Sequence, residues 1–219
     1  MCSPIAQEFL VTQSTRPDVD ARREAIVEAA ARVFARKGLR SARMADIAEE
    51  ANLTAGALYR YFPGKNELMR EVFQDAVSRN LRVFEDEAQS GGSPIDTLER
   101  VGRRLLLEND DWDSLVCQMQ MTVEAARDPD DFGADLSRTR QEIRKLLAIT
   151  IERAQDAGEI TQDIDPAVLG ALLHAASSGI QMLKLEHDDT IDTGAILDLL
   201  VRMVTGMTPV DANPAKGSD

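Results

Sequence analysis

Apolar residues are spaced most regularly between residues 44 and 68, where they predict two short helices and the start of a longer one. Residues three and four apart share a helix face, and in the first helix this face contains Met44, Ile47, Ala48 and Ala51. Asn52 and Thr54 then suit a tight turn, because Asn accepts the left-handed backbone that ends a helix and Thr caps the next helix. Leu58 and Phe62 share one side of the second helix. Two helices joined this closely are typical of the helix-turn-helix, whose second helix enters the DNA major groove.

Longer helical patterns flank this pair. A first helix is predicted over residues 20–37, capped by Asp18 or Asp20 and ended by Gly38. Its buried stripe would contain Ile26, Ala30, Val33 and Phe34. After a turn at Pro63 and Gly64, another helix is predicted from Lys65 to about Ala88. Its inner side would contain Leu68, Val72, Phe73, Ala76 and Phe84.

The remainder of the chain also has a helical pattern, and alternation typical of a strand is lacking. Further helices are predicted over 95–109, 112–127, 134–157, 166–187 and 190–206. Asp165 and Pro166 are a favourable cap and first residue for one of them. We therefore predict an all-α fold with an N-terminal helix-turn-helix domain and a C-terminal helical domain for ligand binding and dimerisation. The expected divisions are a flexible arm (1–19), a DNA-binding domain (20–64), a regulatory domain (65–207) and a disordered tail (208–219).

The charge is distributed unevenly between these divisions. The net charge of the chain is −13, yet residues 1–70 carry 11 Lys and Arg against 9 Asp and Glu, and residues 71–219 carry 14 against 29. Only the N-terminal part can approach phosphates favourably, and the acidic remainder should repel DNA. Cys2 and Cys117 provide no disulfide framework, the N-terminus is a poor signal peptide, and no apolar run is expected to approach the length of a membrane span. These features predict a cytoplasmic protein with no membrane partner.

The order of residues across 22–70 resembles the tetracycline-repressor (TetR) family of transcriptional regulators. The resemblance is specific because many positions coincide at fixed spacing. The residues that carry it are Ile26, Ala29, Ala30, Phe34, Gly38, Ile47, Ala48, Ala51, Gly56, Leu58, Tyr59, Phe62, Lys65 and Leu68. The resemblance implies an all-helical homodimer that binds a palindromic double-stranded DNA operator through its first three helices. The remaining helices would then dimerise and sense a small-molecule effector.

Transferred onto the family motif, the backbone contacts to DNA would be Thr54, Tyr59, Tyr61 and Lys65. The predicted reading helix, Ala55 to Tyr61, begins with Ala55, Gly56 and Ala57, which have no side-chain donors and let the helix backbone approach the bases. Arg60 is the one long donor in this helix and Arg43 starts the preceding helix, so base readout is expected from one of them. Family members often carry Thr at the position of Arg43 and Lys at that of Ala55. The alternatives are that Tyr59 packs inside the domain and that Arg60, like Arg22, Arg23, Arg36, Lys37 and Arg40, is a solvated charge.

Candidate effector-binding and dimerisation residues lie in the C-terminal half. A mainly apolar ligand between helices would contact Trp112, Val116, Met119 and His174, although Met and Trp at helical spacing also fill cores and a lone His is often structural. The last two predicted helices would form a four-helix bundle with those of a second subunit. The interface residues would be Ala171, Ala175, Ser178, Met182, Leu197, Leu200, Val201 and Val204. Burial within one subunit would produce the same stripes.

The chain has few features of an enzyme. Its two histidines, His174 and His187, are too few and badly spaced for a metal site, and neither a phosphate loop nor a dinucleotide motif occurs. We therefore expect no cofactor, no metal and no catalysis, and predict a ligand-responsive repressor. Two alternatives stay open. The first is a regulator controlled by a protein partner or by no ligand, and the second is an acidic helical enzyme or binding module that keeps the helix-turn-helix for structure only.

Overall fold

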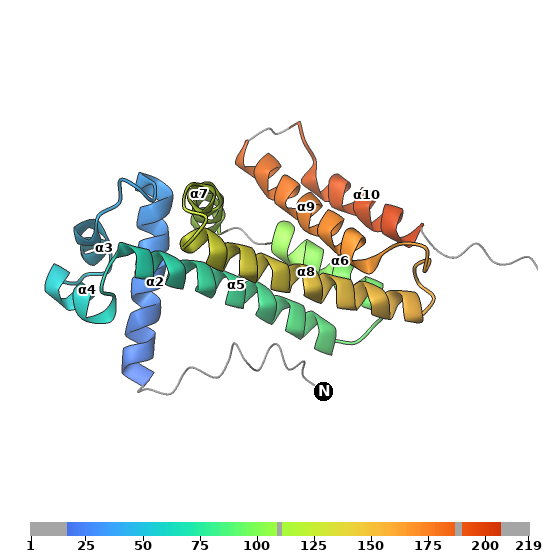
Figure 1. Cartoon of the computed structure of the whole chain (residues 1–219), viewed down its shortest axis with the longest axis horizontal. Coiled ribbons are helices and arrows are strands. Elements are labelled where there is room, and N and C mark those ends of the chain that lie inside the picture. The colour runs from blue at the N-terminus through green and yellow to red at the C-terminus, as the bar shows by residue number, and fades with distance from the viewer. Residues whose placement is uncertain (1–16, 109–110, 187–189, 207–219) are drawn as a thin grey trace, which may run out of the picture. The chain divides into compact units, whose positions relative to one another are not determined.

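The computed structural model describes residues 17–108, 111–186 and 190–206, and these residues form helices and connecting turns without a strand (Figure 1). They divide into two compact units that meet within one helix, between Asp75 and Ala76. The fold class is therefore all-α, as predicted. Residues 1–16 of the expected arm, His187 and the expected tail lie outside the described residues.

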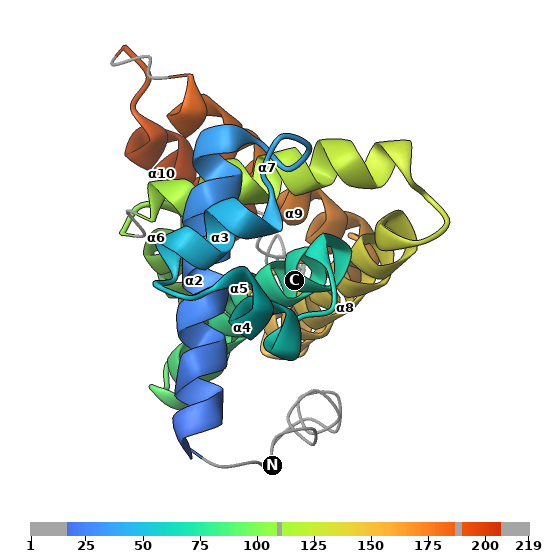
Figure 2. The same ribbon diagram turned by 90° about the vertical axis from the view of Figure 1, so that its left-hand side faces the viewer.

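The N-terminal unit contains α2 (Pro17–Lys37), α3 (Met44–Glu50), α4 (Ala55–Tyr61) and the first part of α5 (Lys65–Gln89). Figure 2 shows α3 packed beside α2 and α4 beside α3. The predicted start of the first helix was wrong. Pro17 begins α2, so Asp18 and Asp20 lie inside the helix rather than before it. Proline suits a first helical position because its fixed φ is already helical.

The turns in this unit follow the local chemistry of their residues. Gly38 adopts a φ of 81° as its backbone N–H donates to the Phe34 carbonyl at 2.9 Å, which ends α2. Asn52, in the turn that follows α3, adopts the left-handed backbone with a φ of 53°. Thr54 Oγ1 then accepts from the Ala57 backbone N–H at 3.2 Å and caps α4. These three predictions are confirmed. Gly38 ends α2, and Asn52 and Thr54 form the tight turn between α3 and α4.

Aliphatic and phenylalanine side chains fill the N-terminal unit. The predicted stripes of α2, α3 and α4 are buried except for Ala51, which is partly buried. Phe34, Ile47, Leu58 and Phe62 are fully excluded from solvent. Burying a side chain of this size contributes about 1.5–3 kcal/mol relative to leaving it exposed. The inner side of α4 is therefore committed to the core, which leaves its other side for solvent or a partner.

The C-terminal unit contains the remainder of α5 and five further helices. These are α6 (Pro94–Leu106), α7 (Trp112–Arg127), α8 (Phe132–Asp156), α9 (Pro166–Leu185) and α10 (Thr193–Thr205). Each lies within a few residues of its predicted range. Asp165 Oδ1 accepts from the Ala167 and Val168 backbone N–H groups, so the predicted cap of α9 is confirmed. Ser93 and Asp96 cap α6 reciprocally, because each side chain accepts from the other's backbone N–H.

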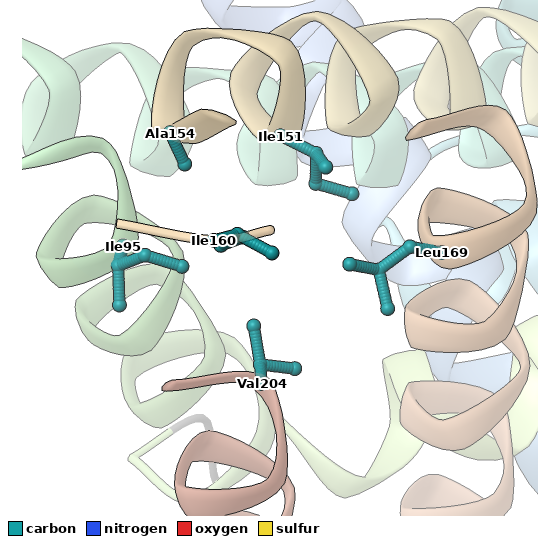
Figure 3. Close-up of a cluster of buried hydrophobic side chains, with 6 residues drawn as sticks. All are labelled: Ile95, Ile151, Ala154, Ile160, Leu169 and Val204. Atoms are coloured by element: carbon teal, nitrogen blue, oxygen red, sulfur yellow. The ribbon is translucent and has the colours of Figure 1, made fainter. Parts of the chain in front are cut away.

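The core of the C-terminal unit lies where α6, α8, α9 and α10 meet. Figure 3 shows its side chains converging from these helices and from the turn after α8. The cluster consists of Ile95, Ile151, Ala154, Ile160, Leu169 and Val204. The antiparallel helices α8 and α9 approach closely at Gly170, where an added Cβ would lie 3.2 Å from the Ala148 nitrogen and 3.3 Å from the Arg144 oxygen.

One helix of this unit is more apolar than we expected. By length and composition alone α9 could cross a membrane, and 17% of its most apolar window is buried. The expectation that no apolar run approaches a membrane span was therefore wrong. The apolar character of α9 was missed because small and polar residues interrupt the apolar ones in this helix, so no long unbroken apolar run is visible in the sequence. Helices of soluble proteins pass the same test of length and composition. In this structure α9 presents an exposed apolar face that includes Val168, Leu172 and Met182.

Candidate nucleic-acid interface

The helix α4 has one buried side and one exposed side. Leu58 and Phe62 point into the core, and the exposed positions are Thr54, Ala55, Gly56, Tyr59 and Arg60. Ala57 and Tyr61 lie at the border and are partly buried. An added Cβ at Gly56 would meet no atom within 4 Å, so the surface there is formed by backbone. The small residues at the start of α4 have no side-chain donors, and polar side chains surround them. A surface of this kind can fit closely into a DNA groove.

Tyr59 and Arg60 are directed toward solvent. Tyr59 is 52% exposed, so it does not pack into the core of the unit. Arg60 is exposed, and no residue in the described part of the chain forms an ion pair or hydrogen bond with its guanidinium. The five donors of that group are therefore available for a bidentate partner.

Three arginines of α2 form ion pairs that brace the N-terminal unit. Arg23 of α2 forms a 2.9 Å ion pair with Glu71 of α5, and its guanidinium lies 4.3 Å from the ring centre of Phe62. Arg32 and Arg36 both pair with Glu50 of α3. Hydrogen bonds from these two arginines lower the pKa of Glu50 below its ordinary value. Arg36 is exposed, as predicted, and Arg23 is partly buried. Both nevertheless pair with carboxylates on other helices.

Arg43 lies at the start of α3, next to an acidic residue. Its backbone N–H donates to the Asp46 carboxylate at 3.0 Å, and Lys37 pairs with the same carboxylate at 2.9 Å. These contacts hold the pKa of Asp46 below its ordinary value. The hydrogen bond from Lys37 has the larger effect, and the backbone hydrogen bond from Arg43 adds to it. The Arg43 side chain is exposed. Asp46 partly offsets the charge of Arg43, so Arg60 carries the more available positive charge of the two.

Lys65 has a role that the motif did not indicate. Its ammonium donates to the backbone carbonyls of Leu39, Arg40 and Ala42, at 2.8, 3.1 and 3.2 Å. Three acceptors match the three hydrogens of an ammonium. Lys65 therefore ties the start of α5 to the loop between α2 and α3, and the expected phosphate contact does not agree with this geometry.

The residues predicted to bind an effector do not form a single cluster. Trp112, Val116 and Met119 lie on the face of α7 opposite its buried residues Cys117 and Met121, since side chains turn by about 100° per residue. Trp112 is 38% exposed. His174 of α9 instead faces α8, where Arg140 and Arg144 act on it electrostatically. Burial, followed by these two charges, lowers the pKa of His174 below its ordinary value.

The predicted dimerisation residues differ between the two helices. On α9 they are all exposed, namely Ala171, Ala175, Ser178 and Met182, and Val168 and Leu172 extend the same face. On α10, Leu197 and Val204 are buried inside the unit, and Leu200 packs against the same interior. Assigning Leu197 and Val204 to a dimer interface was therefore wrong. The large exposed apolar residues of α10 are Leu199 and Met203, which lie between the buried positions along the chain.

Comparisons with known proteins agree with a helix-turn-helix DNA-binding protein. Residues 26–72 match the family model described as bacterial regulatory proteins, tetR family, and residues 117–196 match that of the tetracyclin repressor-like C-terminal domain. The chain therefore belongs to the tetR family of bacterial transcriptional regulators.

Three individual proteins illustrate this relationship. The chain is 24% identical to the HTH-type transcriptional regulator TtgR of Pseudomonas putida, over 94% of this chain and 99% of that regulator. It is also 24% identical to the HTH-type transcriptional repressor KstR2 of Mycobacterium tuberculosis, over 67% of this chain and 73% of the repressor. A crystal structure of a TetR-family regulator from Rhodococcus sp. aligns with a TM-score of 0.70 and 25% identity, over 86% of this chain and 99% of that one. These relatives are transcriptional regulators and not enzymes.

Proposed function

We propose that this DNA-binding regulator is a cytoplasmic repressor that reads a palindromic operator as a homodimer, with the exposed side of α4 in the major groove. Thr54, Tyr59 and Tyr61 would contact phosphates. Ala55, Gly56 and Ala57 would let the helix backbone approach the base edges. The proposal that it represses transcription draws on relatives that are named as repressors.

The observation that carries this proposal is the state of Arg60. Arg23, Arg32 and Arg36 are held in ion pairs within the N-terminal unit, whereas the guanidinium of Arg60 is exposed and has no described partner. A guanidinium at this position matches the two acceptors of guanine, a contact worth about 1–3 kcal/mol of discrimination. Arg43 would supply a second contact from the start of α3.

Dimerisation would use the exposed apolar face of α9, together with Leu199 and Met203 of α10. Val168, Leu172 and Met182 are each more than half exposed, which is unusual for large apolar side chains on one helix. Small residues between them allow the helices of two subunits to approach closely. A two-fold axis at this face would present two copies of α4, which need a separation of about 34–36 Å on DNA.

Effector control would act on that separation. A small molecule bound in the C-terminal unit would favour a dimer in which the two α4 helices are out of register with the operator. The helix α5 would transmit this change, because it belongs to both units. Moving the equilibrium from 1:99 to 99:1 requires about 5.5 kcal/mol of preference between the two states. Control by a protein partner, or no control, is the alternative. Thermal shifts across a metabolite panel separate them, because a ligand of the folded state raises the Tm.

The proposal is tested by Arg60→Ala. The variant and the wild type are titrated by fluorescence anisotropy against a duplex enriched from a random library and against a shuffled duplex of equal length. Loss of a base contact should weaken binding to the enriched duplex by roughly five- to hundredfold, at tenfold per 1.4 kcal/mol, and change binding to the shuffled duplex little. Arg138→Ala removes an equal charge from the exposed side of α8 and serves as the control. Equal losses on both duplexes would refute base readout by Arg60.

A further inference from the structure

The C-terminal unit is strongly acidic in sequence, yet it contains a small basic cluster where α7, α8 and α9 meet. Arg140 and Arg144 lie one turn apart on α8, and both are partly buried. The Arg140 guanidinium donates to the Thr122 hydroxyl of α7 at 2.6 Å. Thr122 itself donates to the Gln118 carbonyl, so its position is fixed.

Packing of α9 against α8 brings His174 to the same place. Gly170 of α9 lies against the backbone of Arg144. The two helices run antiparallel, so the residue one turn further along α9 lies beside the preceding turn of α8. That residue is His174, and Arg140 and Arg144 are the charged groups that act on it. Three basic side chains and one hydroxyl therefore converge from three helices.

The cluster has no balancing carboxylate among the residues that the structure describes. Neither Arg140 nor Arg144 forms an ion pair there. Burial and the neighbouring Arg144 lower the pKa of Arg140, which is the opposite of what a carboxylate partner does to Arg23 or Arg103. Partly buried arginines without a carboxylate partner reduce the stability of a fold, and such arrangements are typical of binding sites.

The geometry points to a binding site for an oxyanion, with Arg140 and Arg144 as its bidentate ligands and His174 and Thr122 at its edge. This inference rests on the proposed function, because it names the class of effector: an organic anion whose carboxylate or phosphate binds the arginines. The guanidinium fork fits both groups, and its positive charge excludes cations. The effector would then differ from the mainly apolar molecule that the sequence suggested.

The test uses a set of small molecules with one tail and different head groups. Octanoate, octyl phosphate, 1-octanol and octylammonium are titrated into the full-length protein by calorimetry, without DNA. Octanoate or octyl phosphate should bind saturably and at least tenfold more tightly than the neutral and cationic compounds, and the tighter of the two anions identifies the head group. The inference is overturned if neither anion binds, or if octanol or octylammonium binds as tightly.

Variants then assign the binding to the cluster. Arg144→Gln should weaken anion binding at least tenfold, whereas Arg138→Gln, on the exposed side of the same helix, should leave it unchanged. An unchanged affinity in Arg144→Gln would overturn the inference. DNA binding by the ligand-free protein is measured separately, so a protein that binds DNA but no anion would refute this site and leave the proposed function standing.

Stability without a ligand provides a second measurement. Removing one of two neighbouring positive charges should raise the Tm of Arg144→Gln by roughly 1–3 °C, whereas Arg138→Gln should not raise it. A lower Tm would mean that Arg144 stabilises the fold, and weaker dimerisation in sedimentation would mean that a partner's carboxylate pairs with it. Either result would overturn the inference.

Discussion

Adding one methyl group at Gly56 should stabilise the protein and weaken its binding to the operator. Gly56 is the second residue of α4, and an added Cβ would meet no atom within 4 Å. Alanine restricts the unfolded chain more than glycine does, so Gly56→Ala should raise the free energy of unfolding by about 0.5 kcal/mol. On DNA, the same methyl group would lie between the helix backbone and the base edges.

The loss on DNA follows from the closeness of that approach. If the methyl group moves α4 outward far enough to break one base contact, binding falls by about 1–3 kcal/mol, or roughly five- to hundredfold. Urea unfolding measures the first effect and fluorescence anisotropy with the enriched duplex measures the second. Gly64→Ala is the matched control, because its added Cβ also meets open space but lies outside α4. An unchanged or higher affinity of Gly56→Ala would refute close backbone approach at this residue.

Three further predictions concern stability and reactivity. Gly133→Ala should lower the free energy of unfolding by about 1–3 kcal/mol in urea titrations. The added Cβ would lie 2.5 Å from the Ala125 carbonyl oxygen and 2.6 Å from that of Asp128, which is too close for either backbone group. A neutral effect would contradict this close packing. Burial raises the pKa of the Cys117 thiol to about 12, so in a Cys2→Ser background a thiol reagent at pH 8 should label it only on unfolding, and immediate labelling would contradict its burial. Arg36 and Arg32 lower the pKa of Glu50, so their stabilising effect is complete above its ordinary pKa of 4.5 and is lost as the pH falls through the lowered value. The Tm of Glu50→Gln should therefore fall less steeply below pH 4.5 than that of the wild type, and parallel curves would refute the coupling.

Much of the fold was predictable because short-range chemistry determines it. The caps at Thr54 and Asp165 and the left-handed turns at Gly38 and Asn52 depend on residues within a few positions of each other, so the sequence displays them directly. The start of α2 was missed because two rules competed at the same place. Asp18 and Asp20 are good capping residues, but Pro17 is a good first helical residue, and the helix begins there.

The unpredicted features depend on residues far apart in the sequence. Lys65 contacts carbonyls 23 to 26 positions earlier, and Arg23 pairs with Glu71 from 48 positions away. No local pattern distinguishes such a brace from a DNA contact. The apolar stripe of α10 was ambiguous for a similar reason, since a face buried in one subunit and a face buried between two have the same periodicity. The basic cluster was missed because Arg140 and His174 meet only when α9 folds back along α8.

Selection from a random duplex library by the purified protein, at physiological salt, would decide whether α4 reads DNA as proposed. We expect enrichment of a palindrome whose half-sites are about one helical turn apart, since two α4 helices related by a two-fold axis require that spacing. Failure of the folded, dimeric protein to enrich any sequence would contradict operator reading by the exposed side of α4.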